Sequence, residues 1–292
     1  MIIAHPLNFH TPAILGLKSF EITGYGVMMM FCFLVGGWLI DRECRRQRFA
    51  SDYAGDMIMA AVVGGIVGAK LWYVALHGIG ALFARGGLVY YGGFVGGALA
   101  VILNGWRRGV PLRWTAQLAA PALAAAYAVG RVGCYLVGDD YGRPTSLPWG
   151  VAFPEGLPHT TAGAMQAEFG LLIPAGATPD TLFAVHPTQL YEVALMLVVF
   201  ALLWRWRTRN RGTGWLFGAY LIFAGAERFF VEIFRAKDDR FVGALTLAQL
   251  FSIVLIALGA VLVTRWSTPG RVAPGAWLEG GKGTLDRAPR GA

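Results

Sequence analysis

The sequence is poor in charged residues, which make up only 14% of its 292 residues. Average soluble proteins carry about 25%, and hydrophobic residues here reach 56%. This balance excludes an ordinary soluble domain and predicts an all-α polytopic membrane protein. The net charge of +8 would indicate a nucleic-acid partner in a soluble protein, but cytoplasmic loops of membrane proteins are rich in Lys and Arg. We therefore expect no nucleic-acid partner.

Cysteine is also scarce, with only Cys32, Cys44 and Cys134. An odd number without close spacing predicts neither a disulfide framework nor a metal site, so no metal or other cofactor is expected. Residues 1–22 lack a basic segment before an apolar run, and the first span is expected to be an uncleaved anchor. No internal repeat is visible, which weakens a transporter interpretation based on inverted repeats.

The apolar stretches predict about seven transmembrane helices of about 20 residues each. Gly, Pro and Tyr interrupt the third and fourth. The predicted spans cover roughly 23–40, 55–78, 88–105, 115–136, 188–205, 214–234 and 243–264. They form one transmembrane domain, 1–266, followed by a Gly/Pro-rich tail, 267–292, that we expect to be disordered.

Basic residues predict which side of the membrane each loop occupies. Arginine clusters follow the first, third, fifth and seventh spans, so all four clusters fall on one side. By the positive-inside rule that side is the cytoplasm, which places the N-terminus in the periplasm and the C-terminus in the cytoplasm. Segment 139–187 is rich in Gly and Pro and too polar to span, and it predicts a small periplasmic head between spans four and five.

Two arginines, Arg131 and Arg228, lie inside predicted spans. A charge at membrane depth costs roughly 2.5–3.5 kcal/mol even on lenient scales, and such charges usually serve a polar cavity, an ion path or an anionic ligand. A pair of them makes a lipid phosphate a candidate ligand.

The motif GRVGCYLVGDDYGRPT (130–145) begins in a span and runs into the predicted head. Its four glycines permit close approach of the backbone to a ligand or to another helix. Arg131 can form two hydrogen bonds with phosphate oxygens, and Arg143 supports a shaped pocket. The alternative is that Arg131 only snorkels from a helix end.

The motif HPTQLYE (186–192) brings polar groups into the start of the fifth span, after a proline suited to a first helical turn. Gln189 and Glu192 share one helix face. They form either an interhelical hydrogen-bond cluster or part of a catalytic site. Tyr191 alone would suit the membrane interface, and His186 is either a proton carrier or a structural residue.

In ERFFVEIFR (227–235), Arg228, Glu232 and Arg235 fall on one helix face. Glu232 would hold Arg228 in place and offset its charge; the alternative is a purely structural ion pair. We expect Arg235, nearest the outer surface, to meet lipid headgroups.

The segment GGLVYYGGFVGG (86–97) surrounds two tyrosines with six glycines, which predicts a helix that packs tightly or breaks. One interpretation is that Tyr90 and Tyr91 are aromatics of the membrane interface. The other is that one of their phenol groups reaches into a cavity. Tyr25, at the outer end of the first span, is typical of an interface aromatic when taken alone.

In this order, the motifs resemble the prolipoprotein diacylglyceryl transferase family over roughly residues 20–265. The resemblance rests on the Tyr-Gly pair 25–26, the double-glycine segment 86–93, GRVGCYLVGDDYGRPT, HPTQLYE, RFFVEIFR and a final LTLAQLFS. It implies a bacterial inner-membrane protein with seven spans, an outside N-terminus and a periplasmic head.

The resemblance also implies a reaction: the diacylglyceryl group of phosphatidylglycerol moves to the lipobox cysteine in the signal peptide of a preprolipoprotein, and glycerol phosphate leaves. No metal is implied. The catalytic residues implied are Arg131, Arg228, Tyr91 and Glu232. Besides Arg131, the substrate contacts implied are Tyr25, Gly92, Gly93, Asp139, Gly142, Arg143, His186, Gln189, Tyr191 and Glu192.

Several positions depart from the family pattern. Tyr91 stands where many members have a histidine that is a candidate base, and Ala224 stands where many have tyrosine. Many members have Asn at the positions of Cys134 and Val137, and Glu at that of Asp139. The changes thin the polar lining of the site and leave open a paralogue with altered substrate or lost activity.

Two alternatives therefore stand beside the transferase: an enzyme of the same fold acting on another lipid or acceptor, and a non-catalytic lipid-binding or transport protein. Geometry discriminates among them. The transferase requires Arg131, Arg228, Tyr91 and Glu232 to converge on one cavity near the outer leaflet.

Overall fold

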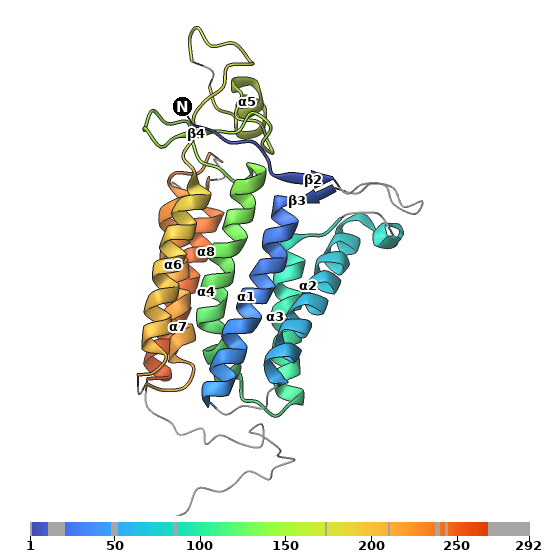
Figure 1. Cartoon of the computed structure of the whole chain (residues 1–292), viewed down its shortest axis with the longest axis vertical. Helices are drawn as coiled ribbons and strands as arrows, with labels where there is room; N and C mark the ends of the chain where they lie inside the picture. The colour runs from blue at the N-terminus through green and yellow to red at the C-terminus, as the bar shows by residue number, and fades with distance from the viewer. Residues whose placement is uncertain are drawn as a thin grey trace, which may run out of the picture. The chain divides into compact units, whose positions relative to one another are not determined.

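The computed structural model describes residues 2–10, 21–47, 52–83, 87–172, 174–209, 211–236, 240–242 and 245–267. Long helices dominate it (Figure 1). The helices are α1 (Gly24–Gln47), α2 (Tyr53–His77), the 3-10 helix η1 (Ile79–Phe83), α3 (Tyr90–Arg107), α4 (Leu112–Val137), α5 (Ala162–Phe169), α6 (Thr188–Trp206), α7 (Trp215–Glu232) and α8 (Leu247–Arg265). The strands are β1 (Ile2–Ile3), β2 (Asn8–His10), β3 (Glu21–Thr23), β4 (Val151–Ala152), β5 (Arg240–Val242) and β6 (Leu245–Thr246).

Each predicted span coincides with one long helix, and five of these helices are long and apolar enough to cross a membrane: α1, α2, α4, α6 and α8. The other two, α3 and α7, are each 18 residues long. Glycines and polar residues lower the hydropathy of α3, and three charged residues lower that of α7. The predicted interruption of the fourth span does not occur, because α4 continues through Pro121. Apart from residue 267, the predicted tail lies outside the described residues.

The chain divides into two compact units. The first unit comprises Met1–Leu34, Leu123–Thr208 and Gly218–Val261, and the second comprises Val35–Ala122, Arg209–Phe217 and Leu262–Ala292.

Glycines bring α2 and α3 into backbone contact in the second unit. A Cβ atom added to Gly68 would overlap the carbonyl oxygen of Gly92 and lie 2.7 Å from the Cα of Gly96. A Cβ on Gly64 would lie 2.7 Å from the carbonyl oxygen of Gly96. Small residues allow this close packing of membrane helices, which gains van der Waals contact where no hydrophobic driving force acts between helices. The glycine-rich segment thus packs tightly, as one of its two interpretations predicts.

The helices of the first unit also meet at glycines. Gly133 of α4 faces α1, since a Cβ there would lie 3.0 Å from Met28 Cβ and 3.4 Å from the Cα of Tyr25. Gly225 of α7 lies against α8, where an added Cβ would be 2.8 Å from the carbonyl oxygen of Ser252. These contacts hold the N-terminus of α1 beside α4, and α7 beside α8.

Residues 138–187 form a head of short elements beyond the ends of α4 and α6 (Figure 1). Within it, β4 pairs in parallel with β1, and α5 begins after Thr161, whose hydroxyl accepts a hydrogen bond from the backbone N–H of Ala164. The helix ends at Gly170, whose φ of 66° is the left-handed conformation that glycine adopts without strain.

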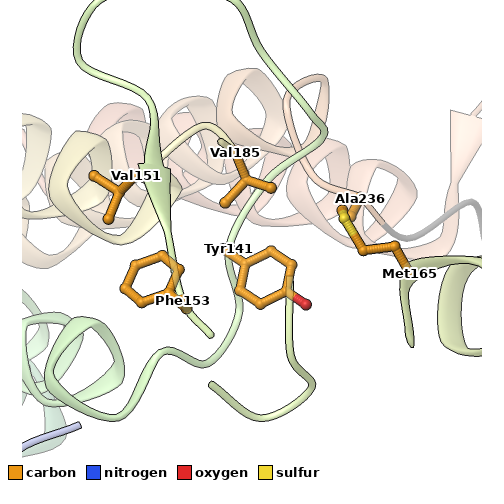
Figure 2. Close-up of a cluster of buried hydrophobic side chains, with 6 residues drawn as sticks. All are labelled: Tyr141, Val151, Phe153, Met165, Val185 and Ala236. Atoms are coloured by element: carbon orange, nitrogen blue, oxygen red, sulfur yellow. The ribbon is translucent and has the colours of Figure 1, made fainter. Parts of the chain in front are cut away.

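A small hydrophobic core stabilises the head (Figure 2). Its buried members are Tyr141, Val151, Phe153, Met165, Val185 and Ala236. The rings of Tyr141 and Phe153 stack with centroids 5.8 Å apart, and the Tyr141 hydroxyl donates to the carbonyl oxygen of Pro158 at 2.8 Å. Because Ala236 follows α7, this core ties the end of α7 to the segments that follow α4 and precede α6.

Candidate active site

The predicted polar motifs meet in the first unit, where three helices end or begin next to the head. Arg131 lies within two turns of the end of α4, and Glu192 lies one turn after the start of α6. Arg228 and Glu232 occupy the last turn of α7. Four side chains that the sequence singles out are therefore carried by three different helices to the same end of the unit.

Ion pairs connect these side chains directly. The Arg131 Nε pairs with Glu192 Oε2, and the other Glu192 oxygen lies 3.8 Å from Arg228 Nη1. The second Arg228 nitrogen, Nη2, lies 2.5 Å from Glu232 Oε2. Arg131, Arg228 and Glu232 thus converge, and Glu192 joins the two arginines.

Two further residues close this chain of contacts into a ring. Glu232 Oε2 lies 3.8 Å from Arg235 Nε, and Arg235 Nη2 pairs with Asp140 Oδ1. The other Asp140 oxygen accepts a hydrogen bond from Arg131 Nη1 at 2.8 Å. We call this set the charge ring; its members are Arg131, Glu192, Arg228, Glu232, Arg235 and Asp140.

Pairing explains how the charge ring tolerates burial. The side chains of Glu192 and Glu232 are only 1% and 2% exposed. Removing an ion from water costs several kcal/mol, which well-placed opposite charges offset. Each carboxylate bridges two arginines, so the three positive and three negative charges balance.

Asp140 occupies a special position in the turn after α4. Its φ of 61° is left-handed, a conformation that Asp adopts more readily than most residues with a side chain. Burial alone would raise the pKa of this carboxyl, but the charges of Arg235 and Arg131 and hydrogen bonds from both lower it to about 2. Asp140 is therefore ionised throughout the neutral range. By contrast, burial raises the pKa of the neighbouring Asp139.

Three buried guanidinium nitrogens of the charge ring make no hydrogen bond among the described residues: Arg131 Nε, Arg131 Nη2 and Arg228 Nη1. Arg131 Nε is ion-paired with Glu192, which leaves Arg131 Nη2 and, at 3.8 Å from the same carboxylate, Arg228 Nη1. Buried polar groups are nearly always hydrogen-bonded, so such exceptions indicate a site with a ligand or a catalytic role. The two nitrogens can donate to the oxygens of an anion.

The first turn of α6 fixes the backbone that carries Asp140. The Thr188 hydroxyl donates to the carbonyl oxygen of Asp140 at 2.8 Å, and Gln189 Nε2 donates to that of Asp139 at 2.5 Å. Both side chains are fully buried. The predicted hydrogen-bond cluster is therefore present, while Glu192, one turn on, belongs to the charge ring.

Other predicted residues hold the same turn from outside. The backbone N–H of Gly142 donates to the carbonyl oxygen of His186 at 2.8 Å, and Arg143 Nε donates to that of Arg235 at 2.9 Å. The Tyr191 hydroxyl lies 3.1 Å from His186 Nδ1 and accepts from Trp149 at 2.8 Å. Burial lowers the pKa of His186. These contacts indicate that the four residues hold the turn that carries Asp140 in position. Their contacts with substrate stay predictions.

The remaining predicted residues divide between the units. Tyr25 belongs to the first unit and lies in the first turn of α1, where it faces Gly133 as described above. Tyr91, Gly92 and Gly93 belong to the second unit, where Tyr91 is 65% exposed and the two glycines pack against α2. The structure therefore gives these glycines a packing role, and their contact with substrate stays a prediction.

Sequence reasoning missed two members of the charge ring, Asp140 and Arg235. The expectation that Arg235 meets lipid headgroups differs from its geometry, since its side chain is 14% exposed and pairs with Asp140. The three-residue spacing between Glu232 and Arg235 is a sequence signal for contact on one helix face. No sequence signal predicts that Arg235 pairs with Asp140, which lies 95 positions earlier.

Comparisons with known proteins identify the family of this chain. The family model described as prolipoprotein diacylglyceryl transferase matches residues 12–265. Relatives named phosphatidylglycerol–prolipoprotein diacylglyceryl transferase include those of three bacteria. That of Nitrosomonas europaea is 30% identical over 90% of this chain and 91% of its own length, and that of Geobacter sulfurreducens is 30% identical over 87% and 95%. That of Nitratidesulfovibrio vulgaris (strain DP4) is 29% identical over 86% and 93%.

Proposed function

The chain belongs to the prolipoprotein diacylglyceryl transferase family, and from this premise we propose that it transfers the diacylglyceryl group of phosphatidylglycerol to the lipobox cysteine of a preprolipoprotein signal peptide. The names of its relatives supply the two substrates. This is the first step of bacterial lipoprotein maturation.

The observation that carries the proposal is the pair of unsatisfied donors, Arg131 Nη2 and Arg228 Nη1. Glu192 lies between these arginines and fixes both guanidinium groups. A phosphodiester has two non-bridging oxygens that share one negative charge and accept hydrogen bonds from such donors, and arginine binds phosphate in a fixed geometry. The two arginines hold the phosphate of the lipid.

The chemistry follows from that placement. The cysteine thiolate attacks the glyceryl carbon bonded to the phosphate oxygen, an S–C bond forms, and the C–O bond breaks. Its electron pair leaves with glycerol phosphate. Negative charge grows on the leaving phosphate, where prepositioned cations in a site shielded from water stabilise the transition state.

The other predicted contacts have roles consistent with this mechanism. Tyr25 and Asp139, at the outer ends of α1 and α4, line the path of the lipid headgroup. Tyr91, Gly92 and Gly93 at the start of α3 contact the lipid. His186, Gln189, Tyr191, Gly142 and Arg143 keep the turn that carries Asp140 in place, which orients Arg131.

The proposal includes a topology. α3 and α7 cross the inner membrane with the five more apolar helices, which makes seven spans. The head lies in the periplasm, the N-terminus is outside, and the C-terminus is in the cytoplasm. A secreted signal peptide then reaches the charge ring from the side on which the head lies.

A transfer assay with purified protein tests the proposal. The full chain is mixed with phosphatidylglycerol vesicles and a synthetic lipobox peptide, and the thioether product is measured by mass spectrometry. We expect product from the parent, a loss of at least about 100-fold in Arg228→Ala, and parent activity in the control Arg205→Ala, an exposed arginine at the opposite end of α6. If the purified parent protein is folded and still makes no thioether product, the proposal is refuted.

A further inference from the structure

One buried acid lies outside the charge ring. Glu227 precedes Arg228 on α7, and the residue is only 6% exposed. Its Oε1 atom is buried without a hydrogen bond, and no ion pair reaches the carboxylate among the described residues. The other three buried glutamates, Glu43, Glu192 and Glu232, are all paired with arginine. Glu227 is therefore exceptional within the described chain.

An unpaired buried carboxylate is costly, since burial of a charge without a partner is strongly unfavourable. Nearby cations reduce this cost here, because the positive charges of Arg228 and Arg131 both act on Glu227. The carboxylate thus lies within the electrostatic reach of both arginines that we assign to the phosphate. A costly group in this place indicates a chemical role.

The local helix geometry gives the direction of this side chain. Side chains on a helix lean toward its N-terminus, so Glu227 extends over the turn that contains Ala224. Ala224 contributes only a methyl group to that turn. The turn beside the carboxylate therefore carries no long side chain of α7 itself at this position.

The proposed transfer requires a proton acceptor, because the thiolate is the nucleophile and a free cysteine is mostly protonated at neutral pH. Resting on that proposed function, we propose that Glu227 is the general base that takes the proton of the lipobox thiol. The Sγ–H proton moves to a Glu227 oxygen. The sulfur electron pair forms the S–C bond, and the C–O electron pair leaves with glycerol phosphate.

The acids of the charge ring are poorly suited to this task. Each of Asp140, Glu192 and Glu232 faces two arginines. A proton on any of them would break the charge balance that permits burial. Glu227 accepts a proton without disturbing the ring.

A pair of acceptor peptides isolates the proton transfer. One peptide carries the lipobox cysteine, and the other carries selenocysteine, whose selenol is already ionised at neutral pH and needs no base. The parent, Glu227→Gln, Glu227→Asp and the control Glu155→Gln are assayed with both peptides on phosphatidylglycerol vesicles. Glu155 lies on the exposed surface of the head.

We expect Glu227→Gln to lose at least about 100-fold in transfer to cysteine, the usual contribution of a general base. Transfer to selenocysteine should stay within a few-fold of the parent rate. Glu227→Asp should show a smaller loss of the same selectivity, and Glu155→Gln none. A purely structural role would lower both rates alike.

The inference would be overturned if Glu227→Gln kept the parent activity, or if it lost activity equally on both peptides. If Glu227→Gln does not accumulate, Glu227→Asp decides: an unchanged ratio of the selenocysteine rate to the cysteine rate would overturn the inference. Failure of the proposed function is distinct, because the parent would then modify neither peptide.

Discussion

At the scale of single residues, the site is a set of shared partners. Each carboxylate of the charge ring serves two arginines, so the loss of one acid affects two cations. Arg131, for example, contacts both Asp140 and Glu192, and the other two arginines likewise contact two acids each. Two predictions follow from this sharing.

The first concerns Glu192, which is fully buried. Glu192→Gln removes the negative charge between Arg131 and Arg228 and leaves both less compensated. Breaking a buried pair costs about 3–5 kcal/mol, so the midpoint of thermal unfolding in detergent should fall clearly. The exposed Glu155→Gln is the matched control and should leave the midpoint unchanged. Equal midpoints for the two variants would contradict the importance of the ring.

The second concerns pH and Asp140. Its pKa is lowered to about 2 in the folded protein, whereas an unfolded aspartate has a pKa of about 3.9. Its charge therefore contributes stability that is fully present above about pH 4 and is lost as pH falls through about 2. The difference in unfolding midpoint between the parent and Asp140→Asn should be largest near neutral pH and shrink below pH 4. If the difference in midpoint between the two proteins stays constant with pH, the charge of Asp140 does not contribute to stability in this way.

At the scale of elements, the contact of α2 with α3 depends on missing side chains. Gly68→Ala would drive a methyl group into the backbone of α3, and overpacking of this kind costs about 1–3 kcal/mol. Gly55→Ala on the same helix is the control, because nothing lies within 4 Å of its added Cβ. Thermal unfolding should separate the two variants, with a lower midpoint only for Gly68→Ala. Similar midpoints would mean that the two helices do not pack as described.

The sequence predicted the long elements well and the short ones poorly. Apolar length was enough to locate each long helix, and HPTQLYE marked the start of α6 because Pro187 and buried polar residues coincide there. The short strands and α5 were not predicted, since their pairing depends on distant segments such as β1 with β4. Glycine content predicted close packing of α3 but did not identify α2 as its partner.

At the scale of the whole molecule, the proposed topology places the head outside the cell membrane. Leu157, 68% exposed in the head, and Arg209, after α6, provide two probe positions. In intact cells, a membrane-impermeant maleimide should label Leu157→Cys but not Arg209→Cys, with the parent as background. Labelling at position 209 alone would reverse the orientation.

The candidate site was only partly predictable from sequence. Arg131 and Arg228 stood out because charge is rare at membrane depth, and Glu232 because it shares a helix face with Arg228. Asp140 did not stand out, since its role depends on a left-handed turn and on Arg235 in a distant segment. Local spacing predicts which residues share a helix face, whereas the closing of the charge ring depends on how three helices pack.

Complementation tests the central claim most directly. The chain and its Arg131→Ala variant are expressed in a bacterium depleted of its own diacylglyceryl transferase, and thioether lipidation of a reporter lipoprotein is followed by mass spectrometry. We predict lipidation by the parent and none by Arg131→Ala at equal membrane abundance. A reporter that stays unmodified with an abundant parent, or is modified equally by the variant, would contradict the account.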